Sequence, residues 1–234
     1  MSIDKLIASN NQKFSVWKEQ LQEHDDAQYN RIDLSTEEME RVFFQTNELL
    51  IDIANNFFSY GKFKDNWDTS KCYLNVFGQC LLLKSEKMNQ IFYWGVEKNT
   101  FYLESHIMYA EHLRHMTDEF WVMLLELKGL GDFEFSAMGS LSVEERPFFE
   151  NKTSTIFQII RGFMLYQFEK MNGSDYQQPP SMELGQLKLT WDFNTPWAIL
   201  LEQTCKAFKL LYHINYSLWK IEDLAKKKSL KNKY

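Results

Sequence analysis

Glycine and proline are scarce in this sequence of 234 residues, which contains 9 glycines and 4 prolines. These two residues disfavour the interior of a helix more than any others. Large apolar side chains are abundant, with 19 Phe, 11 Tyr and 7 Trp. Few helix breakers and many bulky apolar groups favour long helices that pack against one another. The composition therefore predicts an all-α fold.

Cysteines are also few, and Cys72, Cys80 and Cys205 form no CxxC or CxxH pattern. A small, odd number of cysteines is typical of a reducing compartment, in which disulfides do not persist. The first residues, MSIDKLIASNNQKF, lack the basic and apolar regions of a signal peptide. No apolar run approaches the ~20 residues that cross a membrane. We therefore expect a soluble cytoplasmic protein with no membrane partner.

Motifs that bind nucleotides or build active sites are missing as well. The sequence has no Walker A, GxGxxG or GxSxG pattern, so neither a nucleotide-binding site nor a serine hydrolase is indicated. HExxH and Glu-x-x-His, which are typical of zinc proteases and di-iron bundles, are also absent. We predict no catalytic residue and no cofactor, which makes an enzyme the less favoured class.

Amphipathic patterns account for most of the chain. Apolar residues recur at steps of three and four and predict helices over residues 3–24, 35–59, 69–90, 100–128, 153–171 and 195–224. Ser35 and Glu38 form a capping-box pattern, and Thr195-Pro196 is a favourable helix start. The alternating residues QLKLTW (186–191) predict one short strand. The predicted architecture is one irregular bundle of about six helices, a single helical domain over residues 1–234.

The stretch ESHIMYAEHLRHMTDE (104–119) contains three histidines and four acidic residues. On the predicted helix, residues at steps of seven form columns, because seven residues make nearly two turns. One column contains Glu104, Glu111 and Asp118, and the neighbouring column contains His112, Glu119 and Glu126. Together with the adjacent His115 they make up a polar face, which we call the acidic strip. Like charges at these spacings do nothing to stabilise a helix. The strip is either a solvated face or a surface that binds a basic partner.

A metal site is the alternative interpretation of the same stretch. His112, His115 and Glu119 lie at steps of three and four on the predicted helix and share a face. Two imidazoles and a carboxylate are suitable ligands for a transition metal. Further ligands would have to come from other helices, as they do in di-iron bundles. This reading predicts a helical-bundle metal-dependent enzyme or ligand binder.

Charge is unevenly distributed along the chain. Residues 97–150 contain eleven acids and four Lys or Arg, a net charge of −7, whereas the whole chain has −6. The last nine residues, 226–234, contain five lysines and are expected to fray as a basic tail. An acidic surface accelerates association with a cationic protein and repels nucleic acid. We therefore expect a basic protein partner and no nucleic acid.

A non-catalytic, stoichiometric binding protein is the favoured hypothesis. An acidic helical domain without motifs is similar in general character to many bacterial immunity proteins, so the most specific version is an immunity protein that binds and occludes a cognate toxin through the acidic strip. An adaptor in phage defence or regulation predicts the same charge pattern and stays an alternative. The oligomeric state does not follow from the sequence.

Overall fold

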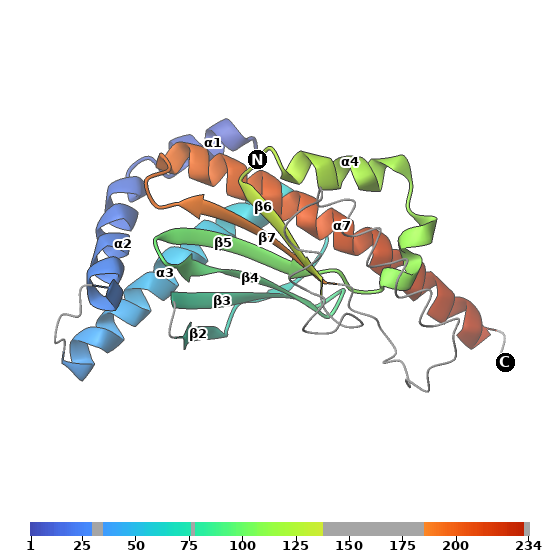
Figure 1. Ribbon diagram of the computed structural model, residues 1–234, viewed down its shortest axis with the longest axis horizontal. Helices are drawn as coiled ribbons and strands as arrows, with labels where there is room; N and C mark the ends of the chain where they lie inside the picture. Colours follow the sequence, from blue (N-terminus) through green and yellow to red (C-terminus); the bar gives the residue numbers. More distant parts are fainter. Residues whose placement is uncertain (30–34, 76–77, 138–184, 232–234) are drawn as a thin grey trace. The chain divides into compact units, whose positions relative to one another are not determined.

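The fold combines helices with a β-sheet. A computed structural model describes residues 1–29, 35–75, 78–137 and 185–231. These residues form a mixed α/β structure with a seven-stranded antiparallel sheet. The sheet order is β1-β3-β4-β5-β7-β6, with β2 also paired to β3 (Figure 1). The all-α prediction is therefore wrong.

The elements of the described residues have the following bounds. The helices are α1 (Ile3–Ser9), α2 (Lys13–Tyr29), α3 (Thr36–Gly61), the 3-10 helix η1 (Ala110–His115), α4 (Asp118–Leu127) and α7 (Trp197–Lys231). The strands are β1 (Trp67–Asp68), β2 (Cys72–Asn75), β3 (Gly78–Ser85), β4 (Gln90–Glu97), β5 (Thr100–His106), β6 (Asp132–Ala137) and β7 (Gly185–Asp192).

Contacts group the chain into two compact units. The first unit contains Met1–Leu103 and Thr190–Lys209, and the second contains Glu104–Leu189 and Leu210–Tyr234. Strands β5 and β7 and helix α7 therefore contribute residues to both units.

Aromatic packing forms the core of the first unit. Phe92 and Trp94 lie two residues apart on β4, so their side chains point to the same face of the sheet. The ring centroid of Trp94 lies 5.2 Å from that of Phe57 on α3. Phe208 on α7 lies 5.2 Å from Phe92 and 5.1 Å from Phe57. Helix α3 and the first part of α7 thus pack on one face of this part of the sheet (Figure 1).

Helix α3 confirms the predicted helix over 35–59. The Ser35 hydroxyl accepts a hydrogen bond from the Glu38 amide at 3.3 Å, and the Glu38 carboxylate accepts one from the Ser35 amide at 2.8 Å. This capping box satisfies two backbone N–H groups that the first turn leaves unpaired. The helix ends at Gly61, and its C-cap residue Lys62 has a left-handed backbone with φ 50°.

The region predicted as a helix over 69–90 forms strands instead. Residues 78–81 of strand β3 are buried in succession, so side chains on both faces of the strand are buried there, and both edges pair, with β4 on one side and β1 and β2 on the other. A strand segment buried on both faces lacks the alternating pattern that identifies a half-exposed strand. Its run of apolar residues, CLLL (80–83), therefore fits the helical template equally well.

A tight hairpin explains the error over residues 100–128. Lys98 and Asn99 have φ values of 47° and 64°, as the two central residues of a type I′ turn require. Lys98 and Asn99 therefore connect β4 to β5, and no helix begins at residue 100. A further left-handed residue, Tyr109 with φ 58°, lies between β5 and η1. The predicted single helix is divided into β5, η1 and α4.

The remaining predictions have mixed outcomes. The predicted helix over 3–24 is interrupted at Asn10, whose buried amide donates hydrogen bonds to the Leu6 carbonyl at 2.7 Å and to Asn56 Oδ1 at 2.8 Å. Strand β7 confirms the strand predicted from QLKLTW, and α7 confirms the last helix. The predicted helix over 153–171 lies outside the described residues. Residues 226–231 are helical, and fraying of the basic tail stays a prediction.

No helix in the described ranges is long and apolar enough to cross a membrane.

Candidate functional site

The acidic strip does not exist as one helical face. Its seven residues lie on three successive elements of the second unit: Glu104 on β5, then Glu111, His112 and His115 on η1, then Asp118, Glu119 and Glu126 on α4. The seven-residue columns depended on one continuous helix, which the left-handed Tyr109 and the extended Met116 interrupt.

Glu104 is not part of an exposed acidic surface. Its side chain is 14% exposed, and its carboxylate lies 3.7 Å from Nε2 of His106 on the same strand. Residues two apart on a strand point to the same face, which explains this pairing.

His112 pairs with a residue that is distant in the sequence. Its Nε2 lies 2.9 Å from Oε2 of Glu222 on α7, and the two side chains are 13% and 17% exposed. The other oxygen of Glu222 lies 3.2 Å from Nζ of Lys226, one turn further along α7. Partial burial raises the pKa of Glu222, but hydrogen bonds with His112 and Lys226 lower it by more. The net effect is a pKa below the usual range, so Glu222 is a carboxylate at neutral pH.

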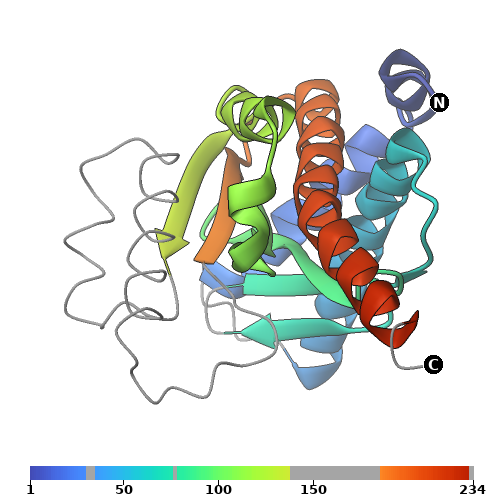
Figure 2. The same ribbon diagram turned by 90° about the vertical axis from the view of Figure 1, so that its right-hand side faces the viewer.

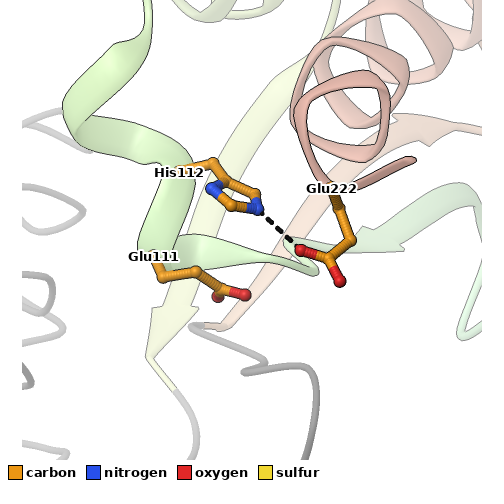
Figure 3. Close-up of side chains that lie close together, drawn as sticks. All are labelled: Glu111, His112 and Glu222. Carbon is orange, nitrogen blue, oxygen red and sulfur yellow. Dashed lines mark hydrogen bonds and ion pairs between the residues drawn. The ribbon is translucent and has the colours of Figure 1, made fainter. Parts of the chain in front are cut away.

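Glu111 completes a group of three. Ligand atoms of Glu111, His112 and Glu222 all lie within 4.8 Å of one another. Figure 3 shows the ends of the three side chains converging, two from η1 and one from α7. Oε2 of Glu111 is buried and has no hydrogen-bond partner. A buried carboxylate oxygen without a partner costs free energy, so this atom requires an explanation.

The ligand atoms of the alternative metal-site interpretation, His112, His115 and Glu119, do not converge. His115 is exposed, and its ring centroid lies 6.4 Å from that of His112. Its Nε2 accepts a hydrogen bond from Nε of Arg114 at 3.0 Å. Glu119 is exposed on α4. Of the residues described, the group with converging ligand atoms includes His112 but neither His115 nor Glu119.

Helix α4 has two distinct faces. Phe120, Leu124 and Leu127 are buried. Val122 and Leu125 are 48% and 59% exposed and lie three residues apart, so they form an apolar pair rather than an isolated exposed side chain. At 100° per residue they lie on one side of the helix with three exposed acids. We call this surface the α4 outer face: Asp118, Glu119, Val122, Leu125 and Glu126. Figure 2 shows η1 and α4 in green, following one another along the chain.

Comparisons with known proteins gave no match. No protein-family model fits the chain, and searches of curated proteins and of solved structures found no significant similarity.

Proposed function

We propose that this chain is a non-catalytic, stoichiometric binding protein that masks a basic protein partner through the α4 outer face. Its most specific form is a cytoplasmic bacterial immunity protein that neutralises a cognate toxin. The observation that carries the proposal is the exposure of Val122 and Leu125 among three acids on one helix face.

The composition of the α4 outer face fits a protein interface. Binding energy at such interfaces is concentrated in a few buried residues near the centre, surrounded by contacts that contribute little energy but exclude water, and the rim is polar. Leu125 and Val122 supply the apolar centre, with exposed fractions of 59% and 48%. Asp118, Glu119 and Glu126 supply a rim of one charge sign.

The negative charge of Asp118, Glu119 and Glu126 favours a basic protein as the partner. Three carboxylates on one exposed helix face repel acidic proteins and nucleic acid and attract a basic surface. The net charge of the chain, −6, adds a long-range attraction of the same sign. A toxin that acts on nucleic acid has a basic active surface, and an acidic inhibitor can occlude it. An adaptor in phage defence or regulation would use the same face and differs in the identity of its partner.

Capture of the partner from the native cell tests the proposal. The tagged chain is used at low salt, and bound proteins are identified by mass spectrometry and quantified. The expected result is one basic protein at a one-to-one ratio. The substitution Leu125→Ala should weaken binding of the partner by about 2 kcal/mol, because it truncates the more exposed of the two apolar side chains of the α4 outer face.

A matched control separates the α4 outer face from general surface effects. Leu74 on β2 is 48% exposed, so Leu74→Ala removes the same atoms from another exposed site. The wild type and Leu74→Ala should capture the partner equally. Equal capture by Leu125→Ala would contradict a role for the α4 outer face, and an acidic partner would contradict the masking hypothesis.

A further inference from the structure

One imidazole and two carboxylates converge in the second unit, outside the α4 outer face. Their ligand atoms lie within 4.8 Å of one another, so small side-chain rotations bring them to the roughly 3–4 Å that separates donors around a single cation. Glu111 and His112 are adjacent on η1, and Glu222 comes from α7 (Figure 3). The His112 and Glu222 side chains are only 13% and 17% exposed, so bulk water screens this group weakly.

The Glu111 carboxylate supplies a second, independent observation. Its Oε2 is buried without a hydrogen-bond partner, although an ionised carboxylate has several acceptor positions. His112 Nε2 is already in contact with Glu222 at 2.9 Å. Protein contacts therefore satisfy Glu222 and leave a buried oxygen of Glu111 unpaired. A cation between the three groups would satisfy that oxygen and reduce the repulsion between the two carboxylates.

We infer that Glu111, His112 and Glu222 bind one divalent transition-metal ion of the first row. An imidazole nitrogen suits zinc, iron, copper and nickel better than it suits calcium or magnesium, which prefer oxygen ligands, and the two carboxylates also suit manganese. Three protein ligands leave at least one position for water. The group differs from His112, His115 and Glu119, the alternative metal site considered from the sequence, and it shares no residue with the α4 outer face.

The ammonium group of Lys226 competes with such an ion for the carboxylate of Glu222. Its Nζ lies 3.2 Å from Oε1 of Glu222, and its side chain is 64% exposed, so it can move into solvent at little cost. Metal binding requires His112 to present a free lone pair at Nε2, with its remaining proton on Nδ1. Coordination therefore replaces the contacts of Glu222 with His112 and Lys226, and removal of Lys226 should strengthen metal binding.

Calorimetric titration of the full chain tests the inference. The affinity tag is removed, residual metal is stripped with chelator, and ZnCl2 and MnCl2 are titrated separately at neutral pH. The expected result is saturable one-to-one binding of at least one ion. Loss of a ligand should weaken binding by more than the roughly 10- to 100-fold that loss of an outer-shell partner causes. Glu111→Gln, His112→Gln and Glu222→Gln each remove one ligand, whereas Lys226→Met should bind more tightly.

Two controls keep the outcome interpretable. His115→Gln and Glu119→Gln remove nearby exposed groups outside the converging group and should leave the affinity unchanged. Circular dichroism without metal checks that each variant is folded, and bound metal should raise the thermal midpoint of the wild type. Equal affinity of the wild type and the three ligand variants would overturn the inference, as would the absence of saturable binding for both ions. Neither result affects partner capture, which depends on different residues.

Discussion

A buried histidine makes the stability of the first unit dependent on pH. His24 on α2 is 1% exposed, and its Nδ1 lies 3.1 Å from Oγ1 of Thr46 on α3. Its Nε2 is buried without a partner. Burial disfavours the charged imidazolium and lowers the pKa of His24 to about 4, from 6.5 in an unfolded chain.

The sign of the effect follows from these two pKa values. The native state binds fewer protons than the unfolded state, so His24 stabilises the fold fully only above pH 6.5. This stability is lost as the pH falls from 6.5 and is gone below about pH 4. The full shift corresponds to about 3 kcal/mol, of which ~2 kcal/mol should be lost between pH 7.5 and pH 5.

Urea unfolding at a series of pH values measures this loss. Other groups also titrate, so the wild type is compared with His24→Asn, whose side-chain amide can reach the Thr46 hydroxyl and carries no titratable group. The difference in the free energy of unfolding between the two proteins should fall by ~2 kcal/mol from pH 7.5 to pH 5. A difference that stays constant with pH would refute a depressed histidine pKa at this position.

Two substitutions test local features of the fold. Ser35→Ala should cost about 1 kcal/mol of stability by urea unfolding, because it removes the cap of α3, and Ser35→Asp should retain most of that stability. Gly95→Ala should cost about 2 kcal/mol or more, because a Cβ there would lie 2.4 Å from the Gln79 carbonyl oxygen and 2.8 Å from Tyr102 Oη. A thermal midpoint unchanged by Gly95→Ala would contradict the close approach of β3 and β4.

Features encoded over a few residues could be predicted from the sequence. The capping box of Ser35 and Glu38 lies within one helical turn and specifies the start of α3. The Thr195-Pro196 pair precedes α7, and the alternation in residues 186–191 corresponds to β7. The two helix starts depend on local backbone chemistry, and the alternation in β7 depends on one face of the strand being more exposed than the other. None of the three signals requires knowledge of the rest of the fold.

The central strands could not be recognised in this way. Strand β3 is buried on both faces, so its apolar residues do not alternate with polar ones. The turn at Lys98 and Asn99 lacks the glycine that usually marks a type I′ hairpin. Because the sequence does not reveal that turn, the pattern over residues 100–128 is that of one amphipathic helix. A signal was nevertheless present in β4, whose sequence QIFYWGVE is rich in aromatic and β-branched residues.

The converging group of Glu111, His112 and Glu222 depends on tertiary structure. His112 is separated from Glu222 by 110 residues, and no spacing rule connects them. The sequence places Glu111 and His112 in a polar stretch, but the predicted continuous helix does not form. In the structure the two residues therefore lie next to Glu222 and not next to other residues of that stretch. The exposure of Val122 and Leu125 on α4 could not be predicted either. Both are apolar residue types that are usually buried, and only the fold shows that their side chains are exposed.

The role of the α4 outer face is tested most directly by reversing its charge. The variant Asp118→Lys, Glu119→Lys, Glu126→Lys is compared with Glu19→Lys, Glu40→Lys, Glu48→Lys, which changes the net charge equally at exposed positions on α2 and α3. Affinity for the captured partner is measured at low and high salt. The α4 variant should lose both affinity and salt dependence, whereas the control should keep most of both. Equal losses in the two variants would contradict a specific interface on α4 and would leave only a general effect of net charge.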